Sequence, residues 1–169
     1  MVVAACGNYA DMIPPSSQPS DSTTGVSPSG GDAATLITMP GQIFKPGTRV
    51  VVAEDDRVSQ AVLTMILQKF GLDVHVACDG IRALELIREV TPALVMMDMQ
   101  MPLMDGAEAI RVLRGDTAAP QPPVVVLSAN RLSQAQIDDL NLLGVVDFLL
   151  KPVNRSRLYG VLSRVLPLI

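Results

Sequence analysis

Five short apolar runs, each followed by a segment whose apolar residues recur at helical spacing, constrain the fold most strongly. The runs occupy residues 49–53, 73–78, 93–97, 124–127 and 145–150. Strands this apolar are typical of a sheet that is buried on both faces. Because strand and helix alternate along the chain, the crossovers are expected to be right-handed and the strands parallel. The sequence therefore predicts an α/β fold, a doubly wound five-stranded parallel sheet with five helices.

Local signals place the ends of the helices. Gly71 follows the first helical stripe, and Asp79 begins the second helix. Ser133 with Gln136 three residues later forms a capping-box pattern at the start of the fourth helix, and Asn154 precedes the last. The fourth helix has a thin apolar stripe, which predicts a marginal helix.

The first 47 residues differ in composition from the rest of the chain. Serines and glycines lie between six prolines, and large apolar residues are few: the prolines are Pro14, Pro15, Pro19, Pro28, Pro40 and Pro46. Such a segment buries too little apolar surface to offset its ordering entropy. We expect a disordered leader or linker over residues 1–47 and one folded domain over residues 48–169.

Charge and hydropathy exclude several classes of protein. The net charge is −4, and all 13 Lys and Arg residues lie at or beyond Lys45, so the chain lacks the basic face of a nucleic-acid-binding protein. No run approaches the roughly 20 apolar residues of a membrane span. Two cysteines are too few for a disulfide-rich scaffold. We expect a cytoplasmic protein without a membrane segment.

Polar residues follow the strands at the ends where a parallel sheet binds ligands. They are Glu54, Asp55, Asp98, Ser128 and Lys151. If the strand order is 2-1-3-4-5, the acids that follow the first and third strands face one crevice. Three carboxylates there repel one another unless a cation lies among them, and oxygen ligands of this kind suit Mg²⁺.

This group of residues suggests phosphoryl chemistry. A carboxylate beside Mg²⁺ can attack a phosphorus centre and form an acyl phosphate, while a lysine neutralises charge on the phosphoryl oxygens. Asp98 is the expected nucleophile and carrier, and Lys151 and the Ser128 hydroxyl are expected to contact the phosphoryl group.

Four motifs resemble the receiver domain of two-component response regulators: AEDD (53–56), MMDMQMPLMDG (96–106), VLSAN (126–130) and FLLKPV (148–153). The resemblance implies the flavodoxin-like fold with strand order 2-1-3-4-5. It also implies that Glu54, Asp55 and Asp98 bind Mg²⁺ together with the backbone carbonyl of Gln100. Asp98 would take a phosphoryl group from a histidine kinase or a histidine phosphotransfer protein.

The resemblance further implies a switch. Phe148 would turn inward as Ser128 moves. The surface formed by the fourth helix, fifth strand and fifth helix would then change, and with it the downstream protein that binds there. The Lys151–Pro152 bond is expected to be cis. Such a domain is a phosphoacceptor in signalling and not an enzyme beyond its own phosphorylation and dephosphorylation.

Departures from the family pattern leave alternatives open. Glu54 replaces the commoner aspartate, and this form, with the leader, favours the C-terminal receiver of a hybrid histidine kinase over a stand-alone receiver. One alternative is a receiver-like interaction module that does not turn over phosphate. An aspartyl-phosphate hydrolase is a weaker alternative, since it usually carries a second acid where this chain has Gln100.

Overall fold

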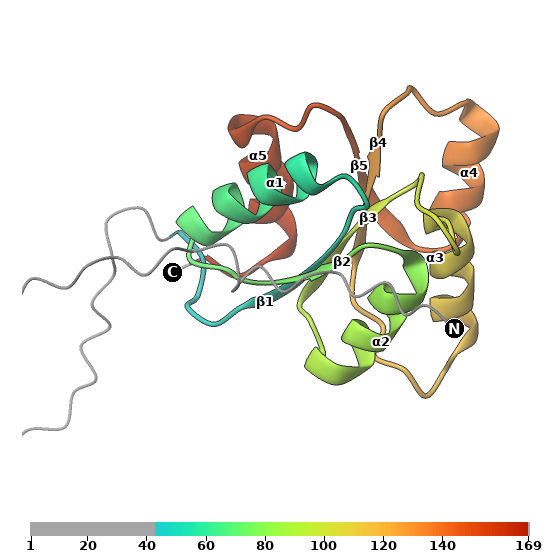
Figure 1. Ribbon diagram of the computed structural model, residues 1–169, viewed down its shortest axis with the longest axis horizontal. Coiled ribbons are helices and arrows are strands. Elements are labelled where there is room, and N and C mark those ends of the chain that lie inside the picture. The colour runs from blue at the N-terminus through green and yellow to red at the C-terminus, as the bar shows by residue number, and fades with distance from the viewer. Residues whose placement is uncertain (1–42, 169) are drawn as a thin grey trace, which may run out of the picture. The chain divides into compact units, whose positions relative to one another are not determined.

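A five-stranded parallel sheet with the order β2-β1-β3-β4-β5 forms the centre of the domain, as predicted (Figure 1). The computed structural model describes residues 43–168, so most of the expected leader lies outside the described residues. The strands are β1 (Arg49–Ala53), β2 (Asp73–Ala77), β3 (Leu94–Asp98), β4 (Val124–Ser128) and β5 (Val145–Leu150). The helices are α1 (Arg57–Lys69), α2 (Gly80–Val90), α3 (Gly106–Gly115), α4 (Gln134–Leu142) and α5 (Arg155–Val165).

Side-chain caps fix where the helices begin. At each of the five N-termini the capping side chain accepts a hydrogen bond from a backbone N–H three residues later, which satisfies one of the donors that a helix end leaves open. The caps are Asp56, Asp79, Asp105, Ser133 and Asn154, and Ser133 forms the full capping box with Gln136. The predicted helix starts at Asp79, Ser133 and Asn154 are confirmed.

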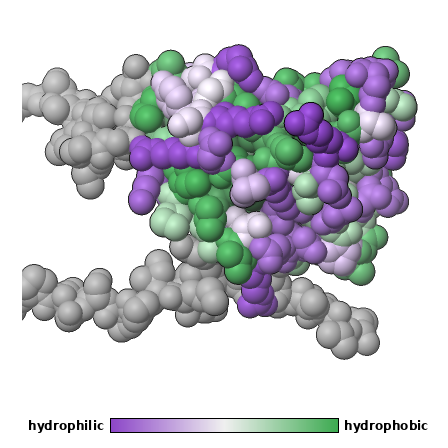
Figure 2. Space-filling view, turned by 90° about the horizontal axis from the view of Figure 1, so that it is seen from above, coloured by the Kyte–Doolittle hydropathy of each residue, from purple (hydrophilic) through white to green (hydrophobic). Residues whose placement is uncertain are grey.

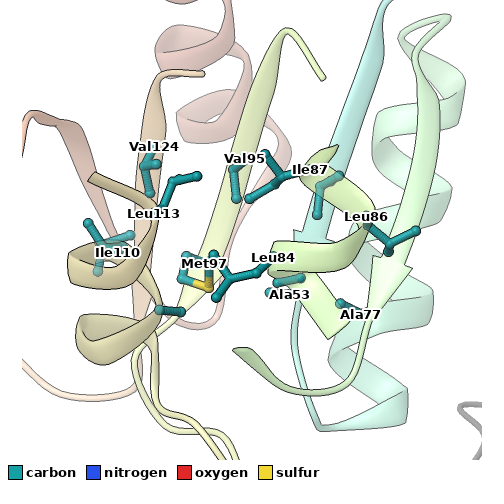
Figure 3. Packing of buried hydrophobic residues seen from close by; sticks show 14 of the residues in the cluster. Ala53, Ala77, Leu84, Leu86, Ile87, Val95, Met97, Ile110, Leu113 and Val124 are labelled. Carbon is teal, nitrogen blue, oxygen red and sulfur yellow. The ribbon is translucent and has the colours of Figure 1, made fainter. Parts of the chain in front are cut away.

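Alternation along the strands divides the core into two layers, one on each face of the sheet. Val50 and Val52 of β1 pack with residues of α1 and α5. Val51 and Ala53 point to the other face and pack with residues of α2 and α3. Figure 3 shows this second layer, in which Leu84, Ile87 and Ile110 lie against the strands. Because β1, β3 and β4 have neighbours on both sides and helices on both faces, their positions are fixed tightly.

Helix α4 is anchored much less than the other helices. Leu140 is its only buried residue, and Leu142 at its end is 87% exposed. A helix is stabilised mainly by packing of its apolar face, so one anchor makes α4 marginal, as its thin apolar stripe predicts.

The folded domain includes residues ahead of the expected boundary at residue 48. Phe44 is fully buried and lies edge-on to Phe70, with ring centroids 6.0 Å apart. It also forms an antiparallel bridge with Leu168. A lone aromatic residue in a segment rich in proline and glycine has no periodic partner in sequence, so the sequence pattern did not indicate this contact.

The Lys151–Pro152 peptide bond is cis, as the family resemblance implies. Within residues 43–168, none of the helices has the length and apolar character needed to cross a membrane.

Candidate functional site

The site lies at the carboxyl edge of the sheet, where neighbouring strands deliver polar side chains. Glu54 directly follows β1, Asp98 is the last residue of β3, and Lys151 directly follows β5. The backbone N–H of Lys151 donates to the Ser128 carbonyl at 2.8 Å, which continues the pairing of β5 with β4 and fixes the start of the lysine side chain. Parallel strands therefore bring residues far apart in sequence to one place.

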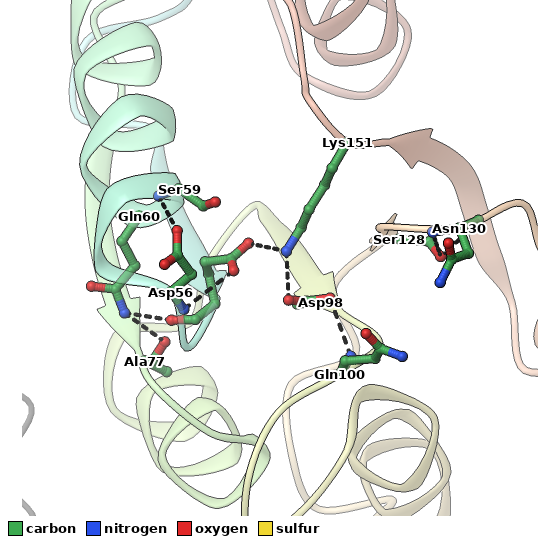
Figure 4. Close-up of polar contacts among 10 residues, drawn as sticks. Asp56, Ser59, Gln60, Ala77, Asp98, Gln100, Ser128, Asn130 and Lys151 are labelled. Carbon is green, nitrogen blue, oxygen red and sulfur yellow. Dashed lines mark hydrogen bonds and ion pairs between the residues drawn. The ribbon is translucent and has the colours of Figure 1, made fainter.

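Lys151 bridges two buried carboxylates (Figure 4). Its Nζ lies 2.5 Å from Oε2 of Glu54 and 2.6 Å from Oδ2 of Asp98. Glu54 is fully buried and Asp98 is 3% exposed. The Glu54 Oε2 atom makes no hydrogen bond of regular geometry, and its contact is this close ion pair. Lys151 thus supplies the positive charge that the two buried acids need.

Asp55 completes an acidic cluster with Glu54 and Asp98. One carboxylate oxygen from each of the three residues lies within 4.8 Å of the others. Asp55 is exposed, so the cluster is open to solvent on one side. The backbone N–H of Gln100 donates to Oδ1 of Asp98 at 3.1 Å, which orients that carboxylate from the loop after β3.

The electrostatics of the cluster follow from burial and mutual repulsion. Burial raises the pKa of Glu54, the nearby charge of Asp98 raises it further, and the contact with Lys151 offsets part of this rise. Burial alone would lower the pKa of Lys151, but the close polar contacts with Asp98 and Glu54 outweigh burial, so the lysine pKa is raised. The lysine therefore keeps its positive charge between the two acids.

These donors fit a hard divalent cation. The three carboxylates offer only oxygen ligands, their oxygens are close enough to share one ion, and one side remains open to water, which Mg²⁺ retains in most protein sites. No His or Cys belongs to this cluster, so the set does not suit a softer metal such as zinc or copper.

Ser128 and Phe148 lie apart from the acidic cluster. Ser128 ends β4, and its hydroxyl donates to the carbonyl of Asn130 in the following loop at 2.6 Å. Figure 4 shows this pair separate from Lys151 and Asp98. Phe148 is half-buried and lines a cavity that also includes Ser128. Of the residues expected at the site, the structure brings together Glu54, Asp55, Asp98 and Lys151, with Gln100 at its margin.

Two positioning residues carried no functional signal in the sequence. The side-chain amide of Gln60 on α1 donates to the carbonyl of Glu54 at 2.5 Å and so ties the helix to the acidic loop. A Cβ added at Gly106 would lie 2.1 Å from the carbonyl oxygen of Asp98. The glycine therefore lets α3 begin directly against the end of β3. In sequence, Gln60 reads as an ordinary polar helix residue and Gly106 as part of a turn.

The domain matches a known protein family over most of its length. The family model described as "Response regulator receiver domain" matches residues 50–163, which is most of the described domain. The chain belongs to the response regulator receiver domain family. Receiver domains are signalling domains that histidine kinases phosphorylate, and they typically bind Mg²⁺ at an acidic site.

Similar proteins include a transcription factor and a DNA-binding response regulator. Transcription factor SKN7 of Saccharomyces cerevisiae is 33% identical over 123 residues, which cover 73% of this chain and 19% of that protein. DNA-binding response regulator MtrA of Mycolicibacterium paratuberculosis is 34% identical over 110 residues, which cover 65% of this chain and 47% of that protein. This receiver chain thus spans less than half the length of these relatives.

A solved receiver domain carries the metal. The receiver domain of sensor histidine kinase PA1611 from Pseudomonas aeruginosa is 30% identical, has a TM-score of 0.63, and covers 70% of this chain and 97% of its own. It was solved with a magnesium ion coordinated in its active site cleft.

Proposed function

We propose that this receiver takes a phosphoryl group onto Asp98 from a phosphohistidine of a histidine kinase or histidine phosphotransfer protein, with Mg²⁺ held by Glu54, Asp55 and Asp98. The observation that carries this proposal is the acidic cluster, in which one carboxylate oxygen each from the adjacent Glu54 and Asp55 and from Asp98 lies within 4.8 Å of the others. Lys151 bridges Glu54 and Asp98. The backbone carbonyl of Gln100 is the proposed fourth protein ligand.

The proposed reaction uses groups that the fold already holds in place. An Asp98 carboxylate oxygen attacks phosphorus, and the P–O bond forms as the P–N bond to the donor imidazole breaks. The imidazole carries a proton from solvent on its other ring nitrogen and therefore leaves as the neutral base. Bound Mg²⁺ supplies charge neutralisation at the phosphoryl oxygens. Lys151 exchanges its contact with Asp98 for a phosphoryl oxygen, and so keeps its charge beside the reacting group.

The switch follows from the added charge. A phosphoryl group brings about −1.5 to −2 charge units and strong acceptor oxygens. We propose that the Ser128 hydroxyl then leaves the Asn130 carbonyl for a phosphoryl oxygen, and that Phe148 moves into the space beside it. The surface formed by α4, β5 and α5 changes as a result and is read by a downstream protein. The weak anchoring of α4 supports a movable element there.

We also propose a cellular setting for the domain. The protein works in the cytoplasm as a phosphoacceptor without a separate enzymatic activity, has no direct contact with nucleic acid, and uses residues 1–47 as a leader or linker. The Glu54 form of the acidic pair favours a receiver at the C-terminal end of a hybrid kinase.

Labelling with acetyl phosphate and Mg²⁺ tests the phosphoacceptor. We expect an adduct that is stable in acid and labile in base, lost in EDTA and absent from Asp98→Asn. Asp105→Asn is the matched control, because Asp105 lies in the same loop region, caps α3, and asparagine caps a helix equally well. Equal labelling of wild type and Asp98→Asn would overturn the site, and labelling that persists in EDTA would overturn the metal. The absence of any adduct would favour a receiver-like interaction module.

A further inference from the structure

A cavity of about 370 Å³ lies beside the edge strand β5, apart from the acidic cluster. It opens between the loop before α4, α4 itself and α5. Its lining residues come from all of these elements and share little with the acidic site: Ser128, Asn130, Arg131, Leu132, Ile137, Phe148, Leu149, Leu150 and Arg157. Its volume falls in the range of about 300–1,000 Å³ that is typical of ligand pockets.

The wall of this cavity is largely apolar. Leu132, Ile137 and Phe148 are half-buried, so each presents part of its side chain to the opening. Figure 2 shows that hydrophobic residues reach the surface of this protein in patches bordered by hydrophilic ones. An apolar side chain placed in the cavity would remove this surface from water, which is the main favourable term in association.

The only charged lining residues are two arginines, Arg131 and Arg157, and both are exposed. Within residues 43–168 neither guanidinium forms an ion pair, although Asp138 and Asp139 lie on the nearby α4. Three arginines outside the cavity are ion-paired: Arg82 with Glu85 and Glu89, Arg88 with Asp116, and Arg164 with Asp147. The remaining arginines among residues 43–168 form no ion pair. In a chain of net charge −4, the cavity therefore has an uncompensated positive rim.

We infer that this cavity binds a short acidic segment of a partner protein, with one apolar side chain in the cavity and carboxylates on Arg131 and Arg157. The inference rests on the surface assigned to the downstream partner under the proposed function and adds the chemistry of that partner. A carboxylate suits an arginine because two parallel N–H groups can donate to its two oxygens. A basic or purely apolar segment would leave both arginines without a counter-charge.

The cavity also touches the proposed switch. Ser128 and Phe148 belong to its lining, so movement of either residue changes its shape. An acidic segment bound there is therefore in contact with the residues that respond to phosphorylation. Docking itself requires only the unphosphorylated form described here, so it can be tested without a phosphoryl donor.

Fluorescence anisotropy of the full chain with a short fluorescein-labelled peptide of glutamates around a single leucine tests the inference. We expect saturable binding that weakens with added salt. Arg131→Glu and Arg157→Glu should each weaken binding by about tenfold or more, as the loss of a charge-assisted hydrogen bond implies. Arg111→Glu is the matched control, because Arg111 is an exposed arginine on α3, outside the cavity, and should leave binding unchanged.

Several results would overturn the inference. These are no saturable binding, equal loss in Arg111→Glu, or equal binding of a peptide in which lysines replace the glutamates. Peptide-induced amide shifts away from α4, β5 and α5 in NMR spectra would also overturn it. If sedimentation detects a dimer that the peptide does not dissociate, the cavity belongs to a second copy and not to an acidic partner. The peptide-binding experiment uses no phosphoryl donor. Its failure would therefore not contradict the proposed phosphorylation of Asp98, which the labelling experiment tests separately.

Discussion

Replacing Lys151 with methionine tests the charge balance of the site, because it keeps much of the side-chain volume and removes the cation. Nζ lies 2.5 Å and 2.6 Å from oxygens of Glu54 and Asp98. At an effective dielectric constant of about 20, each contact is worth about 6 kcal/mol of Coulomb energy before desolvation is subtracted. Removing one partner of a buried ion pair typically costs about 3–5 kcal/mol. Because the lysine side chain is 20% exposed, we expect Lys151→Met to lower the free energy of unfolding by about 2–4 kcal/mol.

Urea denaturation in EDTA and again in excess Mg²⁺ measures this loss. If Mg²⁺ binds the same carboxylates, it should return a large part of the stability that Lys151→Met removes in EDTA. Adding Asp98→Asn to Lys151→Met should also recover stability, with a coupling of about 1 kcal/mol or more between the two positions. Lys69→Met is the control, since Lys69 is exposed in the last turn of α1 and its substitution should stay within about 0.5 kcal/mol of wild type. A loss for Lys151→Met below about 1 kcal/mol, or no effect of Mg²⁺, would refute the reasoning.

Three further predictions follow from packing and charge. Phe44→Ala should lower the free energy of unfolding by about 2–4 kcal/mol in urea denaturation, because it removes a fully buried ring, and a value near zero would show that residues 43–47 contribute nothing to folding. Gly106→Ala should sharply reduce labelling of Asp98 by acetyl phosphate, because the added Cβ would overlap the Asp98 carbonyl; wild-type labelling would contradict this contact. The hydrogen bond from Arg88 lowers the pKa of Asp116, so stability from this pair is present above the ordinary aspartate pKa and is lost as pH falls through the lowered one. NMR titration should show the Asp116 pKa rising toward its ordinary value in Arg88→Gln, and an unchanged pKa would contradict the assignment.

The fold was predictable because its signals are local and repeated. Each strand is a short apolar run, and caps such as Asp79 and Ser133 mark helix starts through side chains that bond the adjacent backbone. The meeting of Glu54, Asp98 and Lys151 was predictable for a different reason. Parallel strands must end at one edge of the sheet, so polar residues at those ends converge without any local signal connecting them.

Other features depend on packing that no sequence period encodes. The hydrogen-bond partner of the Ser128 hydroxyl cannot be told from the motif, because a hydroxyl can rotate toward the Asn130 carbonyl or toward a ligand. The burial of Phe44 depends on Phe70 and Tyr159, which lie 26 and 115 residues further along the chain. The need for glycine at position 106 arises from the backbone of β3, a neighbour that only the folded structure reveals.

The bridge between Phe44 and Leu168 has a consequence for how this domain can be joined to other proteins. The polypeptide enters and exits side by side, at the end of the sheet where the strands begin, whereas the acids gather where the strands finish. Because the two ends of the described domain lie close together, the domain could be inserted into a loop of another protein without distorting either connection. A partner fused there starts at the opposite end of the sheet from the acidic cluster.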